Sequence, residues 1–394
     1  MQILNQAVIL AGGQGTRLGK ITKKIPKALI KFENKPFLHY LIENLKINKI
    51  NKIIVLAGHK GNQIQKSLNK FKNVKVIVEK KPLGTGGALL NSFNLLDKNF
   101  LFLNGDSFFN INLQNKILKY FKKNKNIFFL VKNKNYKANK KLSNISINLK
   151  GKIINKIGKL MYSGISILIK KDLIEFKKKK INKLISFEED IAPKLISKNK
   201  VEVDVSNDFF LDIGTVKNYK FGKSNFIKKS KKKCFFFDRD NTLIYDNGYT
   251  YKREDLEWKP GAIKAIKLLN KLNYLVIVIT NQSGIARGYF SERHVKDFHY
   301  YMNQELKKSN AIINDFYYCP FHKNGIGKYK KNSNDRKPGN GMLNKSIKQW
   351  NIDTKKSFFV GDSSCDYLAA KKSHIKYYNA NENLYYIVKK ALNV

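Results

Sequence analysis

The first half of the chain alternates short apolar runs with amphipathic stretches, and this pattern is typical of an α/β fold. The apolar runs predict strands over Gln6–Ala11, Lys52–Ala57, Val74–Val78, Phe100–Asn104, Ile127–Val131 and Ser163–Ile169. The amphipathic stretches predict helices over Phe37–Lys46, Gly61–Asn69, Gly86–Leu96 and Asn115–Lys123. The order of these elements predicts a sheet that carries helices against its faces.

The same alternation restarts after a polar, basic stretch at residues 222–233 that lacks helical periodicity. A chain of 394 residues also exceeds what one hydrophobic core usually serves. We therefore predict two α/β domains, over residues 1–224 and 234–394, joined by a basic linker over 225–233. Strands of the second domain are predicted at Cys234–Phe237, Tyr274–Thr280, Asp315–Tyr318 and Ser357–Val360.

The formal net charge of +48 invites a nucleic-acid interpretation. However, the lysines are spread through every predicted helix and loop and come with heavy use of asparagine and isoleucine, which is typical of an A+T-rich genome. We interpret the charge as a solvated surface and expect no nucleic-acid partner. The positive field should still attract anionic sugar phosphates and nucleotides.

The composition also predicts where the protein works. Three widely spaced cysteines do not form a disulfide framework. No apolar run approaches the roughly 18 residues that a membrane span needs, and the first residues lack the features of a secretory leader. We expect a soluble cytoplasmic protein that has no membrane partner.

A glycine-rich loop follows the first predicted strand. Its glycines allow backbone N–H groups to approach phosphate oxygens closely, because no side chain obstructs them. The arginine that ends the loop can add a bidentate contact to a phosphate. The residues predicted to bind a nucleotide here are Gly12, Gly13, Gly15, Thr16 and Arg17.

Four later segments strengthen this prediction. Lys27 supplies a second cation, and a second glycine-rich turn, which begins at Glu79, suits a base edge or a ribose. Asp106 lies just past a buried strand, where ligands bind in sheets of this kind, and Asp212 supplies another carboxylate. Two carboxylates on one Mg²⁺ that bridges phosphates is an arrangement this metal favours. From the second turn we expect Glu79, Gly84 and Gly86 to contact the nucleotide.

These segments, in this order, resemble the sugar-1-phosphate nucleotidylyltransferases over about the first 220 residues. The resemblance implies a Rossmann-like domain in which a sugar 1-phosphate attacks the α-phosphate of a nucleoside triphosphate. It implies that Arg17 and Lys27 stabilise charge on the transferring phosphates and that Asp106 and Asp212 bind Mg²⁺. Two further matching stretches supply the substrate-binding candidates Gly164 and Glu188, and the first of them resembles the stretch that contacts the sugar.

A pair of aspartates follows the first strand of the second half. Asp238 and Asp240 are two positions apart, so both carboxylates can point the same way. One can attack phosphorus while the other protonates the leaving oxygen, and a metal must neutralise the approach of an anion to an anion. We expect Mg²⁺ to be held by Asp238, Asp240 and Asp362, and Asp366 is a second candidate beside Asp362.

Polar residues after other strands complete the predicted phosphate site. Hydroxyl and amide donors follow the strand that ends near Thr280, and cations lie between this strand and Asp362. The predicted phosphate-binding residues are Thr280, Asn281, Gln282, Ser283, Arg336 and Lys337.

This set resembles the haloacid dehalogenase-type phosphatases, and implies a Rossmannoid second domain. A longer match over about the last 160 residues is similar to heptose-1,7-bisphosphate phosphatases and their histidinol-phosphatase relatives, and implies that Arg287 contacts substrate. Two departures stand out. Asn241 replaces a glycine, and the zinc loop of the family, C-x-H … C-x-C-R-K-P, retains only Cys319 and a displaced His322. We therefore predict that zinc is absent and that Cys319 is a buried thiol.

Together the two resemblances indicate a bifunctional enzyme of GDP-heptose synthesis. Its second half is expected to remove the 7-phosphate of heptose 1,7-bisphosphate. Its first half, which is similar to heptose-1-phosphate guanylyltransferases, is expected to join GMP from GTP to heptose 1-phosphate. The expected partners are GTP and heptose phosphates with Mg²⁺ in both domains, and the oligomeric state stays open. One alternative is a hexose-1-phosphate guanylyl- or thymidylyltransferase fused to a histidinol-phosphatase-like enzyme. Another is a basic nucleic-acid-binding protein that has lost catalysis.

Overall fold

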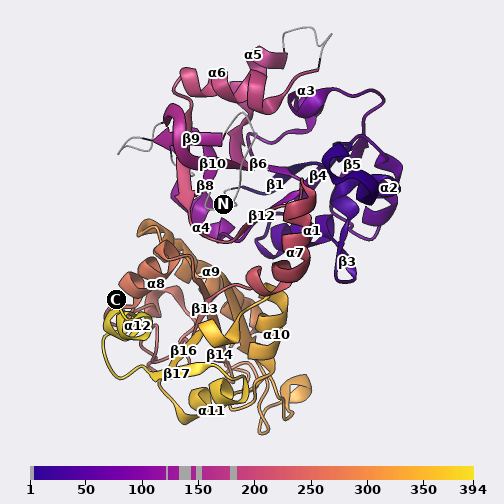
Figure 1. The fold of residues 1–394 in the computed structure, drawn as a ribbon. Helices are drawn as coiled ribbons and strands as arrows, with labels where there is room; N and C mark the ends of the chain where they lie inside the picture. Colours follow the sequence, from indigo (N-terminus) through magenta and orange to yellow (C-terminus); the bar gives the residue numbers. More distant parts are fainter. Residues whose placement is uncertain (1–3, 121–122, 133–142, 148–152, 178–183) are drawn as a thin grey trace. The chain divides into compact units, whose positions relative to one another are not determined.

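The computed structural model describes residues 4–120, 123–132, 143–147, 153–177 and 184–394 (Figure 1). Its packing divides the chain into two compact units. The first runs up to Ile111 and again from Tyr120 to Ser230, and the second comprises Asn112–Lys119 and Lys231–Val394. None of the helices in the described ranges is both long and apolar enough to cross a membrane.

The first unit is built on an eight-stranded mixed sheet of order β11-β8-β10-β6-β1-β4-β5, with β9 paired to β10. Its sheet strands are β1 (Gln6–Leu10), β4 (Lys52–Ala57), β5 (Val74–Val78), β6 (Asn99–Asn104), β8 (Asn126–Lys132), β9 (Ser143–Ile147), β10 (Ile153–Ile169) and β11 (Val201–Ser206). Two small sheets pair β2 (Lys31–Phe32) with β3 (Lys35–Pro36) and β7 (Ser107–Phe109) with β12 (Phe210–Asp212). Its helices are α1 (Phe37–Ile47), α2 (Gly61–Leu68), α3 (Gly84–Asn91), α5 (Ile174–Lys177), α6 (Ala192–Ser197) and α7 (Val216–Lys229).

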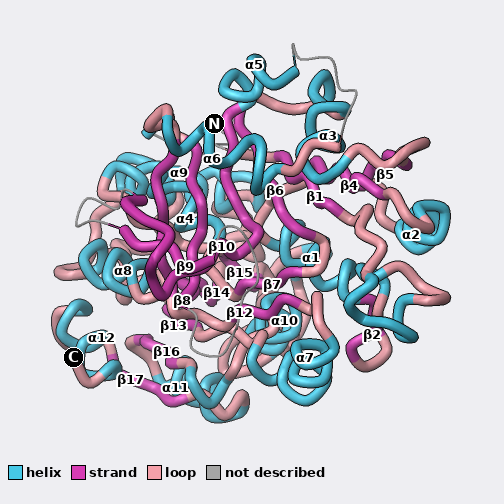
Figure 2. The backbone as a smooth tube through the Cα atoms, turned by 45° about the horizontal axis from the view of Figure 1, so that its top comes forward, coloured by secondary structure: helices cyan, strands magenta, loops and turns pink. Residues whose placement is uncertain are grey.

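Strand β1 lies inside this sheet because its side chains are apolar on both faces. Ala7, Val8 and Ile9 are all fully buried, as is usual for a parallel strand that is covered on both sides. Strands β6, β1, β4 and β5 run parallel to one another and lie side by side (Figure 2). Their carboxyl ends therefore meet at one edge of the sheet, which is the edge where ligands bind in such folds.

The second unit is built on a five-stranded parallel sheet of order β15-β14-β13-β16-β17. Its strands are β13 (Cys234–Phe237), β14 (Leu275–Asn281), β15 (Asp315–Cys319), β16 (Phe358–Gly361) and β17 (Lys376–Asn379). Its helices are α8 (Ala262–Lys271), α9 (Glu292–Lys308), α10 (Gly341–Trp350), α11 (Ser364–Lys372) and α12 (Leu384–Leu392). Helix α4 (Leu113–Tyr120) also belongs to this unit, except for its last residue.

The core of the second unit follows from the spacing of its apolar residues. Ala262, Ala265, Ile266 and Leu269 are buried and line one face of α8, as the helical repeat requires. They pack with α9 and α12 against Phe235, Phe237, Val276 and Val278 of the central strands. Helices α10 and α11 contact β15, β16 and β17. The central strand β13 is thus fixed in place up to the residue that precedes Asp238.

The structure corrects the prediction of a basic linker over 225–233. Helix α7 continues through Lys229, and Phe226 is fully buried against the rings of Phe32, Phe37 and Phe108. The buried positions are too sparse among the lysines for a helical repeat to stand out in the sequence. Aromatic packing against distant residues therefore gives this segment its helical structure.

Candidate active sites

The first site lies where β1, β4 and β5 end. A methyl group built on Gly12 would lie 3.1 Å from the backbone nitrogen of Gly58, and one built on Gly58 would lie 3.3 Å from Oε2 of Glu79. The glycines therefore let three neighbouring chain segments approach closely. Burial raises the pKa of the Glu79 carboxyl above its ordinary value. This carboxylate is a desolvated acceptor beside the glycine-rich loop.

Two cations and two carboxylates converge beside this loop, around Gly214. The Lys27 ammonium pairs with the Asp106 carboxylate. A methyl group on Gly214 would lie 2.7 Å from Oδ1 of Asp212, 2.9 Å from Nζ of Lys27 and 3.2 Å from Nη2 of Arg17. The structure thus brings together the four charged residues that the sequence analysis selected, from four separate segments. Together they could hold a polyphosphate and a divalent cation, because carboxylates are ligands that Mg²⁺ prefers.

Asp106 and Asp212 are adjacent because of the small sheet that pairs β7 with β12. Asp212 lies opposite Ser107, and the N–H of Ile213 donates to the backbone carbonyl of Asp106 over 2.9 Å. The carboxylate of Asp212 accepts a hydrogen bond from the N–H of Gly214 at 2.7 Å. The backbone pairing therefore fixes the separation of the two carboxylates.

The remaining residues predicted for the first site have different environments. Gly15 has a φ of 70°, and a methyl group there would lie 2.8 Å from Cγ2 of Thr22, so the loop turn requires glycine. By contrast, nothing lies within 4 Å of a methyl group built on Gly13. Gly84 and Gly86 pack closely against Ile185. A side chain at either position would collide with Ile185, so this packing alone is a reason for both glycines.

Gly164 and Glu188, the two remaining residues predicted to bind substrate in this domain, lie on separate elements. Gly164 has a φ of 77°, and a methyl group there would lie 2.5 Å from Nδ2 of Asn104, at the end of β6. Oε2 of Glu188 accepts a hydrogen bond from the Thr85 hydroxyl at 3.0 Å. Glu188 is therefore held at the start of α3, the helix that the second glycine-rich turn opens.

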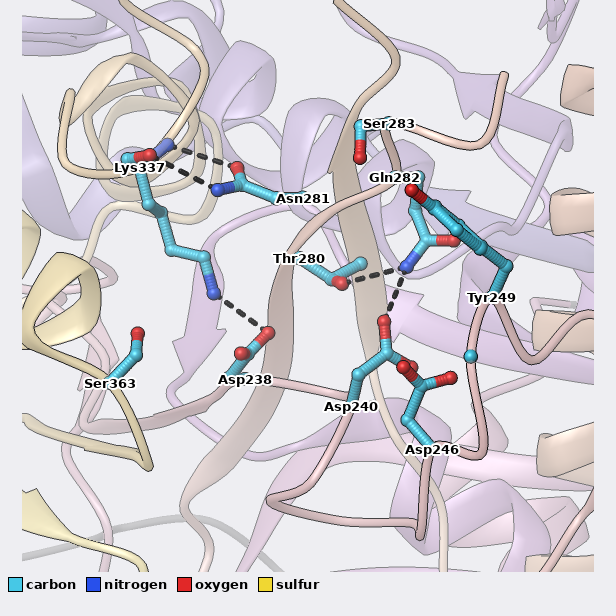
Figure 3. A pocket seen from close by; sticks show the side chains of 11 residues that line it. Asp238, Asp240, Asp246, Tyr249, Thr280, Asn281, Gln282, Ser283, Lys337 and Ser363 are labelled. Carbon is cyan, nitrogen blue, oxygen red and sulfur yellow. Dashed lines mark hydrogen bonds and ion pairs between the residues drawn. The ribbon is translucent and has the colours of Figure 1, made fainter. Parts of the chain in front are cut away.

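The second site is a cavity of about 270 Å³ at the carboxyl ends of β13 and β14 (Figure 3). The side chains of Asp238, Asp240, Thr280, Gln282 and Lys337 line it. The parallel strands carry Asp238 and Thr280 to the same edge, which is why residues distant in sequence meet there. The cavity is also lined by Asn281, Ser283, Asp246, Gly248, Tyr249 and Ser363.

Lys337 is the central cation of this cavity. Its Nζ lies 2.7 Å from Oδ1 of Asp238 and 2.6 Å from Oδ1 of Asp366. Burial opposes the charge, but the two carboxylates raise the pKa of Lys337 above its ordinary value. The side-chain amide of Asn281 holds the backbone of Lys337 through two hydrogen bonds, at 3.0 and 3.1 Å. Asn281, which was predicted to bind phosphate, thus positions the backbone of Lys337.

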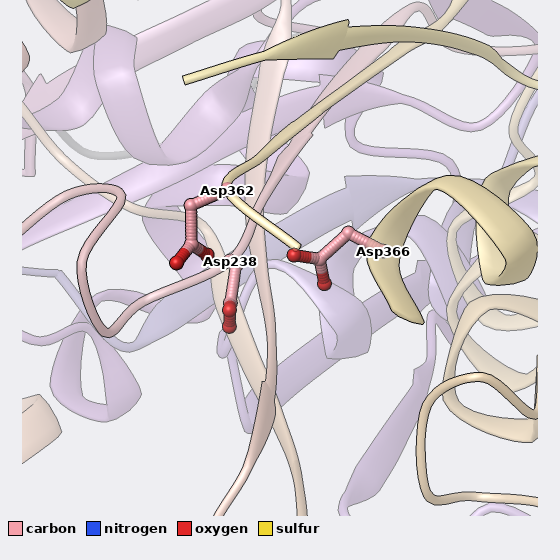
Figure 4. Close-up of side chains that lie close together, drawn as sticks. All are labelled: Asp238, Asp362 and Asp366. Carbon is pink, nitrogen blue, oxygen red and sulfur yellow. The ribbon is translucent and has the colours of Figure 1, made fainter. Parts of the chain in front are cut away.

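Three carboxylates form a candidate metal site (Figure 4). Ligand oxygens of Asp238, Asp362 and Asp366 lie within 4.8 Å of one another. Partial burial raises the pKa of both Asp238 and Asp362, and the nearby carboxylate of Asp366 adds to both rises. Among the residues that the structure describes, this is the only group of three or more potential metal ligands with this spacing. Its oxygen donors fit a hard divalent cation such as Mg²⁺.

Asp240, predicted as a metal ligand, has its carboxylate outside this group. Its Oδ1 accepts a hydrogen bond from Nε of Arg239 at 2.6 Å, and its Oδ2 accepts one from Nε2 of Gln282 at 2.8 Å. Asp366 stands in the group instead, because the capping box of α11 orients its carboxylate through Ser363. The arrangement separates a carboxyl suited to acid–base chemistry from three suited to a cation.

The two predicted substrate arginines lie elsewhere. Arg287 is exposed and does not line the cavity of Asp238. Arg336 lines a neighbouring cavity of about 450 Å³, which also borders Lys337. Arg239, whose side chain is fully buried, was not predicted to belong to the site. Its only signal was an arginine between two aspartates at the end of an apolar strand.

The loop that follows β15 corresponds to the zinc loop of the phosphatases that the sequence resembles, and side-chain contacts hold it in this chain. Cys319 is buried, as predicted, and burial raises its thiol pKa. Nδ1 of His322 accepts a hydrogen bond from the N–H of Asn324 at 3.1 Å. The carboxylate of Glu292 accepts hydrogen bonds from the hydroxyls of Tyr318, at 2.7 Å, and Tyr329, at 2.9 Å. These bonds tie β15 and the following loop to the start of α9.

Comparisons with known proteins agree with this division of the chain. The model of the nucleotidyl transferase family matches residues 6–229, and the model of the polynucleotide kinase 3 phosphatase family matches residues 233–384. D-glycero-beta-D-manno-heptose-1,7-bisphosphate 7-phosphatase from Pasteurella multocida is 43% identical over 145 residues, which are 37% of this chain and 79% of that protein. The protein of the same name from Haemophilus ducreyi is 42% identical over 146 residues, 37% of this chain and 80% of that protein.

A solved structure is also similar to part of this chain. The protein HddC from Yersinia pseudotuberculosis is 28% identical and covers 57% of this chain and 100% of its own, with a TM-score of 0.48.

The fold and the family matches define an enzyme that pairs a nucleotidyltransferase domain with a phosphatase domain. The chain belongs to the nucleotidyl transferase family through its first part, and through its second part to the family of the heptose-bisphosphate phosphatases named above.

Proposed function

We propose that the second unit removes the 7-phosphate of heptose 1,7-bisphosphate. The observation that carries this proposal is the group formed by Asp238, Lys337 and the carboxylates of Asp362 and Asp366, in a chain that is 43% identical to a 7-phosphatase over 145 residues. In this proposal Asp238 attacks phosphorus, the bond from phosphorus to the leaving oxygen breaks, and Asp240 gives its proton to that oxygen. Water then attacks phosphorus and gives a proton to Asp240, the bond from phosphorus to the Asp238 oxygen breaks, and phosphate leaves.

The proposed metal is Mg²⁺, held by Asp238, Asp362 and Asp366. A divalent cation there supplies charge that lets a phosphate approach a carboxylate nucleophile. Lys337 supports the same approach, since its ammonium already contacts Asp238. Thr280 and Ser283 offer hydroxyl donors along the wall of the cavity.

We propose that the first unit joins GMP from GTP to heptose 1-phosphate and releases pyrophosphate. Arg17 and Lys27 neutralise the phosphates, and Asp106 and Asp212 hold Mg²⁺. Their convergence around Gly214 supports these roles. Such a reaction needs positioning and electrostatic stabilisation but no covalent intermediate.

Glu79 supports guanine as the base. A carboxylate accepts two parallel hydrogen bonds from N1–H and the N2 amino group of guanine, by the same two-point geometry that it offers to arginine. Uracil and thymine present only one N–H, flanked by carbonyl oxygens that a carboxylate repels. The half-buried Glu79 beside Gly58 offers such an acceptor near the glycine-rich loop.

One incubation tests both activities. The protein, heptose 1,7-bisphosphate, GTP and Mg²⁺ should yield phosphate, pyrophosphate and GDP-heptose. Asp238→Asn should stop phosphate release but still convert heptose 1-phosphate, whereas Asp106→Asn should release phosphate without forming GDP-heptose. Because fused enzymes usually share an intermediate, phosphate without GDP-heptose from the unmodified protein would refute the proposed guanylyl transfer.

The nearest alternative keeps both chemistries but changes the sugar or the base. Assays of GTP, ITP, ATP, CTP and dTTP with heptose and mannose 1-phosphates separate the two. GTP should be preferred over ITP, which lacks the N2 amino group, and Glu79→Gln should reduce that preference. A preference for dTTP or for mannose 1-phosphate would favour the alternative.

A further inference from the structure

Arg239 carries a full charge in the interior of the second unit. Its side chain has no exposure to solvent, although it lies between the two aspartates of the active site. A buried guanidinium is costly unless its N–H groups find acceptors. The partners of this arginine therefore indicate why the fold retains it.

Its partners are the general-acid candidate and the residues around it. Nε donates to Oδ1 of Asp240 at 2.6 Å, and Nη2 donates to Oε1 of Gln282 at 3.1 Å. Nη2 also donates to the backbone carbonyl of Thr250 at 2.8 Å. Gln282 in turn donates to Oδ2 of Asp240 at 2.8 Å. Both oxygens of Asp240 are thus bound within one closed network, which fixes the plane of the carboxyl group.

The far side of the guanidinium is held by aromatic residues. Nη1 lies 3.3 Å from Nε2 of His299, whose ring is stacked on Phe316 at 4.3 Å. Burial, together with Arg239, lowers the pKa of His299 well below its ordinary value, so its neutral ring can accept the bond. The guanidinium also lies 5.2 Å above the ring of Phe298. These contacts leave the guanidinium little freedom to turn.

We infer that Arg239 is a positioning residue for phosphate-ester hydrolysis, which holds the Asp240 carboxyl in the orientation that transfers a proton to the leaving oxygen. The inference rests on the proposed phosphatase function. Each carboxyl oxygen has two lone-pair positions, so the bonds from Arg239 and Gln282 leave one on each oxygen for the transferred proton. Asp240 is the group that touches the leaving oxygen, and Arg239 acts through it.

This role has a signature that a structural role lacks. A sugar leaves as an alkoxide, which must be protonated as the bond to phosphorus breaks. A p-nitrophenolate leaves as a stable anion and needs no such proton. Loss of orientation at Asp240 should therefore slow the first substrate far more than the second. General structural damage should slow both alike.

The test compares kcat for heptose 1,7-bisphosphate and for p-nitrophenyl phosphate, with Mg²⁺, in the full chain. Arg239→Met should lower the ratio of the two values by about 10²-fold, since positioned acid catalysis contributes roughly 10²–10⁴-fold, with little change in KM. Asp240→Asn removes the general acid itself and therefore gives the lowest ratio that loss of acid catalysis can produce. Arg293→Met is the matched control, because Arg293 is exposed on α9 and pairs only loosely with Asp297, at 3.8 Å.

If Arg239→Met does not fold, Arg239→Lys is the variant that tests the inference. Lysine keeps the buried charge, but one ammonium cannot reproduce the planar set of bonds to Asp240, Gln282 and Thr250. It should lower the same ratio in the same direction. Equal losses for both substrates, or no loss in a folded variant, would overturn the inference. An unmodified protein that hydrolyses neither ester would instead refute the phosphatase function itself.

Discussion

The ammonium of Lys337 lies 2.7 Å from a carboxylate oxygen of Asp238, in a place where the lysine side chain is only 2% exposed. This contact couples the proposed nucleophile to a cation before any substrate enters. Burial raises the pKa of Asp238, and the nearby ammonium opposes that rise. The nucleophile therefore depends on Lys337 to stay ionised as well as to receive a phosphate.

Replacement of Lys337 by methionine should abolish most of the phosphatase activity. We expect kcat to fall by about 10²–10³-fold, as when a preorganised charge stabiliser is lost. Removal of one partner of a buried ion pair also destabilises a fold by about 3–5 kcal/mol, so thermal unfolding must be followed in parallel. Nucleotidyl transfer by the same chain is the internal control, and Lys345→Met, at an exposed pair with Asp335, is the matched variant. Retained hydrolysis would contradict the role of Lys337.

Neutralisation of Asp362 should weaken Mg²⁺ binding in the second unit. A cation that binds only the folded state stabilises it by about 2.7 kcal/mol at 100 times its Kd. We expect the rise in Tm with added Mg²⁺ to shrink in Asp362→Asn, measured in a background of Asp212→Asn so that the first site does not contribute. Asp335→Asn should keep the full rise. An unchanged rise in Asp362→Asn would remove this residue from the proposed metal site.

The sequence predicted the central strands β1, β4 and β13 well because their apolar runs are buried on both faces, whereas β11 and the half-exposed β17 were not predicted. The run at Lys52–Ala57 was predicted to the residue, and the carboxyl-end rule then placed Asp106 and Asp238 at sheet edges. It was harder to predict which side chains contact one another in the folded protein. The burial of Arg239 and the pairing of Lys337 with Asp366 depend on contacts between segments far apart in sequence. Local periodicity carries no information about such contacts, and for the same reason the helical end of α7 was missed.

Replacement of Asp212 by asparagine should separate the two activities. Asp212 is held by the pairing of β12 with β7 and by the N–H of Gly214, so the change should alter charge more than shape. We expect pyrophosphate release from GTP and heptose 1-phosphate to fall by at least about 10²-fold, as for loss of an electrostatic stabiliser. Phosphate release from the bisphosphate should stay the same. Asp97→Asn, at a surface pair with Lys52, is the control; equal transfer by both variants would count against a metal role for Asp212.

Protonation of Glu292 should weaken the attachment of the loop that follows β15. Hydrogen bonds from Tyr318 and Tyr329 lower the pKa of Glu292 below its ordinary value of 4.5. The stabilisation of the loop by these two hydrogen bonds is therefore complete above a pH of about 4.5. It is lost as the pH falls below that value through the lowered pKa of Glu292. The amide of Ile326, bonded to the carbonyl of Ala286 at 2.8 Å, reports on this loop by hydrogen exchange.

Glu292→Gln should reduce the protection of Ile326 at neutral pH by roughly 1 kcal/mol, the usual net value of such hydrogen bonds at a partly exposed site. The difference from the unmodified protein should vanish in acid, where both side chains are neutral. Glu305 lies on the same helix and pairs with the exposed Lys308 at 2.7 Å, so Glu305→Gln should change nothing at Ile326. Because we predict that side chains rather than zinc hold this loop, a zinc chelator should leave the protection of Ile326 unchanged. Protection that falls on chelation would show that Cys319 and His322 still bind a metal.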